Sequence, residues 1–427
     1  MKRLILASVA LAALAAAPAA AQVAEPRAVA ENVAAAIEEN FFDEARAHTI
    51  AAEVRAAAAA GRYDITNEVD LAAALTATLH PHDGHFRVEY RPPQPNAPAR
   101  PNGGFGNDAR AAYGIPNVTM YPGGIGVVDF RLLADFDPDH FQAKYALDAA
   151  FTMVHGSQAL ILDLRDCAGG SPTMVGYIVG HFFPDGANVY NTFHSRRGDQ
   201  DESPPEQPAS GRRLDTPLFV LTSGRTGSAC ESVAYTLQAA GRATIVGEAS
   251  AGGANPGGLL PVGDNLAVFV SFGTPVNPIT GRNWEGAGVQ PNVVVPVAEA
   301  LTRARTLALQ AALRAPADES AGREAQWALD SLTAESAAYP RNLRDYAGDY
   351  GARSIAIENH RLVLRRDRRP ALVLLPLGQD QFAVSGAAPL QRVTFERGAS
   401  HRHDAHARRR PRIPRFARQL APRRRAR

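Results

Sequence analysis

The sequence has few cysteines and, past its first residues, no long apolar run. Its 427 residues include only Cys167 and Cys230, so at most one internal disulfide can form and a fold held by several disulfides is excluded. Beyond the first 21 residues no stretch is long and apolar enough to span a membrane, so no stable membrane insertion is expected. No internal repeat is present. With 45% apolar residues, the chain can form one large domain with smaller attachments.

The first residues have the pattern of a secretory signal peptide. MKRLILASVALAALAAAPAAAQ joins two positive charges, an apolar run and an Ala-rich cleavage site, which predicts a leader at residues 1–21 and a periplasmic or secreted protein. An uncleaved anchor is the alternative. Export makes a disulfide between Cys167 and Cys230 chemically possible, and a pair of buried thiols is the other interpretation.

Positive charge is concentrated at the C-terminal end. Residues 391–427 hold thirteen arginines and two acids, whereas residues 22–390 hold 30 basic and 41 acidic side chains. The tail at 398–427 has no apolar period and is rich in Arg, Pro and His, which predicts disorder. Nucleic-acid or anionic-surface binding is one interpretation of the tail. We favour a disordered appendage or out-of-frame translation, and we expect no nucleic-acid partner.

Residues 22–90 are expected to form a helical cap. Apolar residues at three- and four-residue spacing predict helices over 29–41, 44–61 and 67–79. The string HPHDGH follows and gathers His80, His82 and His85 around Asp83. Such a cluster could bind zinc, supply a catalytic base, or consist of solvated loop histidines. A Pro/Gly/Asn-rich linker is expected at 91–116.

Residues 117–313 have the alternating pattern of an α/β core. A strand pair at 117–120 and 125–130 precedes a helix at 139–154, an apolar strand at 159–164 and a helix at 172–183. Unbroken apolar strands that alternate with helices indicate a sheet covered on both faces. Gly169 and Gly170 follow the strand at 159–164, where glycine lets the backbone approach a ligand closely.

The most informative stretch runs from Pro217 to Gly258. It predicts a buried strand at 218–221, a Ser/Gly-rich turn, a helix at 229–240 and a second strand at 244–246, which together form a βαβ unit. Ser228 falls where the turn meets the helix, and the unpaired N–H groups there can stabilise an oxyanion. Ser228 is therefore either a nucleophile or a helix cap. Glu231 suits the first helical turn.

The rest of the chain, from residue 266, contains further predicted strands and a helix. Strand and turn are expected at 266–281, Glu285 lies between Trp284 and glycines, and a helix is expected at 297–313. An Ala/Glu-rich segment extends to about residue 338. Short alternating runs then predict a small β module at 340–397.

Four motifs occur in order along the chain: DLRDCAGG at 163–170, TGSACE at 226–231, VGEASAGG at 246–253 and EGAGVQPN at 285–292. Together they resemble those of the tail-specific (C-terminal processing) serine peptidases, a family related to the tricorn core and interphotoreceptor retinoid-binding protein. The resemblance covers about residues 25–300 and implies a ClpP/crotonase-like α/β fold. It implies Ser228 as the nucleophile, with the oxyanion held by the N–H of Ala229 and that of Gly169 or Gly170.

Two departures from the family pattern shape the expected mechanism. The base lysine of the processing peptidases would fall at Gly253, so a Ser-Lys dyad is absent. The tricorn-like branch instead uses a histidine and a glutamate, whose places are taken by His85 and Glu285, although Gly84 stands where tricorn has a serine. The 40 residues from His85 to Ile125 are also too short for the PDZ module that processing peptidases insert there.

The resulting hypothesis is an exported serine peptidase with a Ser228–His85–Glu285 arrangement, a peptide or protein substrate, no cofactor and no metal. A non-catalytic protein that binds a small hydrophobic ligand is the main alternative, and a zinc-dependent hydrolase is the third. The sequence leaves the oligomeric state open.

Overall fold

The structure is a computed structural model and describes residues 25–92, 106, 108–340, 342–387, 390–396 and 413–418. The predicted leader at 1–21 and most of the linker at 91–116 lie outside these residues. The described chain divides into two compact units. Unit 1 contains residues 25–92, 194–199 and 255–274, and unit 2 contains the rest.

Unit 1 is built on the three predicted helices, α1 (Pro26–Asn40), α2 (Glu44–Ala59) and α3 (Glu68–Leu79). The Asp43 side chain accepts a hydrogen bond from the Arg46 N–H, and the Asn67 side chain accepts from the N–H groups of Val69 and Asp70. These caps satisfy donors that the first helical turn leaves unpaired, which is why α2 and α3 begin where they do.

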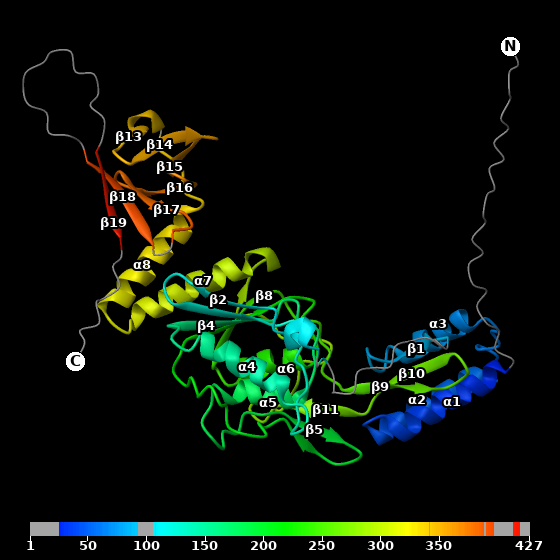
Figure 1. Cartoon of the computed structure of the whole chain (residues 1–427). Helices are drawn as coiled ribbons and strands as arrows, with labels where there is room; N and C mark the ends of the chain where they lie inside the picture. The colour runs from blue at the N-terminus through cyan, green and yellow to red at the C-terminus, as the bar shows by residue number, and fades with distance from the viewer. Residues whose placement is uncertain are drawn as a thin grey trace, which may run out of the picture. The chain divides into compact units, whose positions relative to one another are not determined.

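A hairpin from much later in the chain completes unit 1. Strands β9 (Gly257–Pro261) and β10 (Leu266–Ser271) pair antiparallel, and β10 also pairs with β1 (Arg87–Tyr90). The hairpin lies beside the helices of this unit (Figure 1). The side chains of Leu266, Val268 and Val270 on β10 join the helical core. The predicted cap at 22–90 did not include this hairpin, because we predicted it as part of the α/β core at 117–313. In the structure the hairpin belongs to unit 1.

Unit 2 contains a six-stranded sheet in the order β12-β8-β7-β4-β3-β2. All neighbours are parallel except β2 and β3. Its strands are β2 (Asn117–Tyr121), β3 (Ile125–Asp129), β4 (Ala159–Asp163), β7 (Leu218–Thr222), β8 (Ala243–Gly247) and β12 (Val293–Val294). Because β4 and β7 are adjacent and parallel, the loops after their carboxyl ends meet at one edge of the sheet.

Helices cover both faces of this sheet, as the apolar strands predicted. The helices α4 (Gln142–Met153), α5 (Pro172–Gly180) and α6 (Ala229–Ala239) share one core with the first face. The helix α7 (Val297–Arg314) packs on the opposite face (Figure 1). The remaining elements near the core are the 3-10 helix η1 (Ala109–Gly114) and the strands β5 (Thr192–Ser195), β6 (Gln200–Asp201) and β11 (Gly273–Val276).

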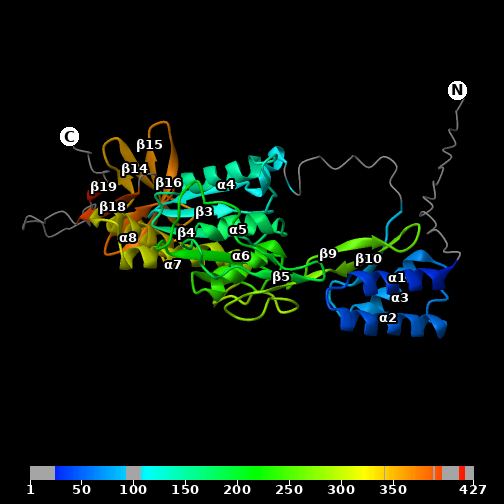
Figure 2. The ribbon, with the colours of Figure 1, turned by 90° about the horizontal axis from the view of Figure 1, so that it is seen from below.

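The C-terminal part of unit 2 is a helix followed by the predicted β module. The Ala/Glu-rich segment forms α8 (Glu319–Ala334), which we had not assigned as a helix. The module is one antiparallel sheet that lies beside α8 (Figure 2), where Ala334 packs against Leu375 and Ala383. Its elements are η2 (Leu343–Asp345), β13 (Gly348–Asp349), β14 (Arg353–Glu358), β15 (Arg361–Arg366), β16 (Arg369–Gly378), β17 (Gln381–Val384) and β18 (Gln391–Glu396).

Part of the tail that we expected to be disordered is a strand. Residues 413–418 form β19 (Ile413–Arg418), which pairs antiparallel with β18 over six residues. The edge of β18 presents backbone N–H and C=O groups that any extended segment can pair with, whatever its side chains. The composition of the tail predicted disorder because composition carries no information on pairing with the edge of another strand. The other tail residues lie outside the described part.

Within the part of the chain that the structure describes, no helix is long and apolar enough to cross a membrane.

Candidate active site

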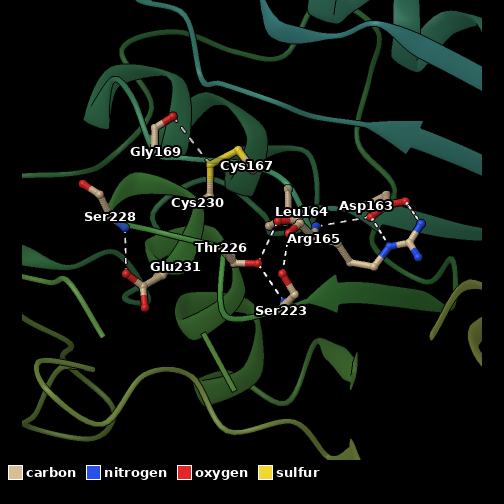
Figure 3. Close-up of a disulfide and its surroundings, with 10 residues drawn as sticks. All are labelled: Asp163, Leu164, Arg165, Cys167, Gly169, Ser223, Thr226, Ser228, Cys230 and Glu231. Carbon is tan, nitrogen blue, oxygen red and sulfur yellow. Dashed lines mark hydrogen bonds and ion pairs between the residues drawn. A yellow bond between two sulfur atoms is a disulfide. The ribbon is translucent and has the colours of Figure 1, made fainter. Parts of the chain in front are cut away.

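Ser228 has an unusual backbone conformation at the junction of β7 and α6. Its φ is 49° and its ψ is −122°, whereas a helix-capping residue ordinarily adopts extended angles. A non-glycine residue at positive φ is strained, and such strain is concentrated at functional sites. In Figure 3 the hydroxyl of Ser228 points away from Glu231, to which its amide is bonded. This conformation distinguishes Ser228 from an ordinary cap and favours the nucleophile interpretation.

Glu231 holds the nucleophile turn from inside the protein. It is fully buried, and its Oε2 accepts hydrogen bonds from the N–H groups of Ser228 (2.7 Å) and Gly253 (2.9 Å). Its Oε1 accepts from the Ser250 hydroxyl and the Gly252 N–H, both at 2.6 Å. Four donors are the partners that a buried carboxylate requires. Glu231 thus fixes the glycine-rich loop at 250–253 to the turn that carries Ser228.

The glycines after β4 lie against the serine. A Cβ placed on Gly169 would be 2.9 Å from the Cβ and 3.4 Å from the Oγ of Ser228, and one on Gly170 would collide with the Leu133 carbonyl. Their φ angles are 127° and 142°, which side chains disfavour. Ala229 is the first residue of α6, so its N–H has no acceptor within the helix. Ser228, Ala229 and Gly169 therefore lie together, as an oxyanion site requires.

The loop after β4 is joined to the nucleophile turn by hydrogen bonds and a disulfide. The Thr226 hydroxyl donates to the Leu164 carbonyl (2.7 Å), and the Gly227 N–H donates to the Cys167 carbonyl (2.9 Å). Cys167 and Cys230 form a disulfide with a Cα–Cα distance of 6.0 Å (Figure 3). The sequence left a disulfide and a pair of buried thiols as alternatives, and the structure contains the disulfide.

A short ion pair supports the same loop at the end of β4. The Arg165 guanidinium binds the Asp163 carboxylate, with 2.6 Å between Nη2 and Oδ2 (Figure 3). It also donates to the Val297 carbonyl at 2.9 Å. Its hydrogen bond to Asp163 raises the pKa of the guanidinium. Arg165 therefore fixes the loop that leads to Gly169.

His85 lies in unit 1, between α3 and β1. The Nδ1 of its ring is 3.1 Å from the Oδ1 of Asp83, and its backbone N–H donates to the same oxygen at 2.8 Å. Burial raises the pKa of Asp83, but hydrogen bonds from the side chain and the backbone of His85 outweigh it, and the pKa is lowered overall. His82 faces a different carboxylate, with its Nε2 2.9 Å from the Oε2 of Glu53. His82 and His85 thus have separate carboxylate partners.

Glu285 lies in unit 2, on the connection between β11 and β12. Its Oε2 accepts a hydrogen bond from the Ala254 N–H at 2.8 Å, and its own N–H donates to the Asn283 side chain. Ala254 continues the 250–253 loop that Glu231 holds. Glu285 is thereby connected to the nucleophile turn through this loop.

Sequence patterns alone did not assign two of these roles. For Glu231 the pattern indicates only an acid suited to a first helical turn, because its bonds to Ser250, Gly252 and Gly253 depend on the fold. For Asp83 it indicates only a member of the histidine cluster. The separation of two residues between Asp83 and His85 in DGH is the signal that could have identified that pair.

The fold and this site define an α/β protein with a serine beside an amide-lined site at the N-terminus of a helix. Residues 125–295 match peptidase family S41. This match confirms the resemblance to the tail-specific peptidases and agrees with the α/β fold class.

Two curated relatives bear related names. A carboxy-terminal-processing protease of Bartonella bacilliformis is 36% identical over 81 residues, which cover 19% of this chain and 18% of that protein. A carboxyl-terminal-processing protease of a Picosynechococcus species is 32% identical over 144 residues, 33% of each chain. The matches thus span only 18% and 33% of the lengths of these relatives.

Solved structures of similar proteins include a lipoprotein and two proteases. A lipoprotein from Streptococcus agalactiae matches with a TM-score of 0.46 at 11% identity, and the match covers 67% of this chain and 96% of the lipoprotein. The photosystem II D1 C-terminal processing protease has a TM-score of 0.42 at 16% identity, with 71% and 100% covered. The tricorn protease has a TM-score of 0.40 at 12% identity, with 65% and 35% covered.

Proposed function

We propose that this protein is a serine peptidase that cleaves peptide or protein substrates with Ser228. The observation that carries the proposal is the strained Ser228 at the start of α6, in contact with Gly169 after the neighbouring strand. A serine hydroxyl is unreactive at its ordinary pKa, so it needs a base. His85 is the proposed base, because imidazole exchanges protons near neutral pH.

The mechanism follows from the roles of these groups. The Oγ of Ser228 attacks the scissile carbonyl while His85 takes its proton, and the N–H groups of Ala229 and Gly169 or Gly170 hold the oxyanion. His85 then gives the proton to the leaving amine, and water hydrolyses the acyl-enzyme by the same steps. Glu285 was predicted to orient His85. Gly253 occupies the position of a dyad lysine, and its N–H is bonded to Glu231.

Hydrolysis of denatured casein and of a mixed peptide library tests this function. Wild type should cleave both, and Ser228→Ala and His85→Ala should each lose several orders of magnitude in kcat, because such residues act as a unit. Activity that survives in Ser228→Ala would refute the proposal. Loss of wild-type activity with a chelator, restored by zinc, would instead favour a metal-dependent hydrolase.

We also propose that residues 1–21 direct export and are removed. The proposal rests on the charged, apolar and Ala-rich order of the first residues. Edman sequencing of the protein from a periplasmic or culture fraction should begin at Gln22. A protein that is recovered only in the cytoplasmic fraction, with residues 1–21 intact, would contradict export.

A further inference from the structure

We propose that the disulfide between Cys167 and Cys230 is a redox switch for catalysis, so that Ser228 becomes reactive only after these two thiols have been oxidised. The proposal rests on the proposed function, because it concerns the reactivity of that serine. It is carried by the place of the two cysteines beside the residues of the oxyanion site.

The disulfide joins the two segments that must meet at the reacting carbonyl. Cys167 comes two residues before Gly169, on the loop after β4. Cys230 comes two residues after Ser228, in the first turn of α6. The Sγ of Cys230 also lies 3.5 Å from the carbonyl oxygen of Gly169 (Figure 3). The bond therefore acts on both halves of the site from two residues away.

Cys167 contacts the nucleophile turn on both sides of Ser228. Its carbonyl accepts a hydrogen bond from the N–H of Gly227, just before the serine, at 2.9 Å. Its sulfur is bonded to Cys230, just after the serine, with 6.0 Å between the two Cα atoms. Reduction removes the second of these connections and leaves the first, so the serine is then held to this loop from one side.

The packing around the site turns loss of the bond into a movement. Both cysteines are fully buried, in the core that α4, α5 and α6 share with the sheet. Two separate thiols need more space than a bonded pair, because non-bonded atoms stay at van der Waals distance, and a close-packed core does not supply that space. A Cβ on Gly169 would already lie 2.9 Å from the Cβ of Ser228. Reduction should therefore shift Gly169 relative to the serine.

Such a shift should cost far more in catalysis than in secondary structure. A displacement of about 1 Å in groups that position a reaction can lower its rate by about 10²-fold. The glycine loop keeps other hydrogen bonds, from the Leu133 N–H to the Gly169 carbonyl at 2.8 Å and from the Ala168 N–H to the Arg131 carbonyl at 3.1 Å. We therefore expect a reduced protein that is folded and unreactive.

The switch operates by thiol–disulfide exchange while the protein folds, before the two sulfurs are buried. A disulfide oxidant, such as oxidised glutathione, accepts two electrons and two protons: its own sulfur–sulfur bond breaks, the Cys167–Cys230 bond forms, and two thiols are released. The cytoplasm keeps thiols reduced, whereas exported proteins meet oxidising surroundings. If the leader at 1–21 directs export, the protein is inactive where it is made and becomes active outside the cytoplasm.

The test compares the rate of labelling by a fluorophosphonate probe in the two redox states of the full-length protein. Wild type is refolded from urea with either dithiothreitol or a glutathione redox buffer, and its thiols are counted with Ellman's reagent. The oxidised protein should have no free thiol and should label at Ser228. The reduced protein, folded by circular dichroism, should label at least about 10²-fold more slowly. Oxidised glutathione should restore the rate as the thiols disappear.

The matched control is the double variant Cys167→Ser/Cys230→Ser, which has two small polar side chains at these positions and cannot form the bond. It should label at the slow rate of the reduced protein, with or without dithiothreitol and oxidised glutathione. Cys167→Ala/Cys230→Ala serves the same purpose if the serine pair does not fold. A double variant that labels at the rate of oxidised wild type would overturn the switch.

The outcomes separate the switch from the proposed function. Folded, oxidised wild type that does not label would sink the proposed function and the switch with it. Equal labelling of the oxidised and reduced folded proteins would overturn the switch alone. Labelling that is lost only together with the circular dichroism signal would also overturn it, because the disulfide would then serve the fold rather than the site.

Discussion

Glu202 is a buried carboxyl behind the nucleophile helix, and its charge should make the stability of the protein depend on pH. It is 3% exposed, and its Oε2 accepts from the Ser232 hydroxyl and from the Asn191 side-chain amide at 2.8 Å. Among the described residues, its Oε1 has no hydrogen-bond partner. Burial outweighs these hydrogen bonds and raises the pKa of Glu202 from 4.5 to about 7.

The sign and size of the effect follow from this shift. Between pH 4.5 and 7 the folded protein binds a proton that the unfolded chain has lost, so the free energy of unfolding decreases as the pH rises. Each unit of pKa shift corresponds to about 1.4 kcal/mol, so the loss reaches about 3 kcal/mol at pH 8 relative to pH 4. The variant Glu202→Gln cannot ionise and should escape this loss.

Urea unfolding followed by circular dichroism from pH 5 to pH 8 tests this reasoning. Glu202→Gln should be close to wild type in stability at pH 5 and about 2–3 kcal/mol more stable at pH 8. His181, whose pKa burial lowers to about 4, titrates in the opposite sense and is present in both proteins, so it cancels in the difference. Glu206→Gln, at an exposed acid of the same segment, should show no such trend. Parallel wild-type and Glu202→Gln curves would refute the account.

The other predictions concern the nucleophile turn. Gly169→Ala should lower the fluorophosphonate labelling rate by more than about 10²-fold, because the added Cβ would lie 2.9 Å from the Cβ of Ser228. The control Gly156→Ala, whose added Cβ would have no atom within 4 Å, should label at the wild-type rate. Glu231→Gln should cost roughly 2–3 kcal/mol in urea unfolding, since its amide faces N–H donors; an unchanged midpoint would contradict the network. Replacing Cys167 and Cys230 with serine should cost about 2–4 kcal/mol, and reductant should then have no further effect.

The elements of the sheet were predictable because their patterns are local. Apolar runs such as 159–164 and 218–221 are long enough to indicate buried strands, and they appear as β4 and β7. The helices of unit 1 were predictable for the same reason, since their apolar residues recur at helical spacing and Asn67 is a strong cap. The family motifs added the order in which the loops after these strands contribute to one site.

Tertiary partners were not predictable from these patterns. A period of two predicts that β10 is a strand, but it does not predict that β10 packs with α1–α3, the last of which ends 187 residues before β10 begins (266 − 79). The strand β19 depends on the open edge of β18 rather than on its own composition. The resemblance pointed to His85 and Glu285, but the contacts between His85 and Asp83 form only once the loop before β1 is folded.

The measurement that tests the central claim most directly is the intact mass of the folded protein after treatment with a fluorophosphonate probe. The account predicts one covalent adduct on wild type, mapped to Ser228, and no adduct on Ser228→Ala or His85→Ala under the same conditions. Unlabelled wild type that is folded by circular dichroism, or equal labelling of Ser228→Ala, would contradict it.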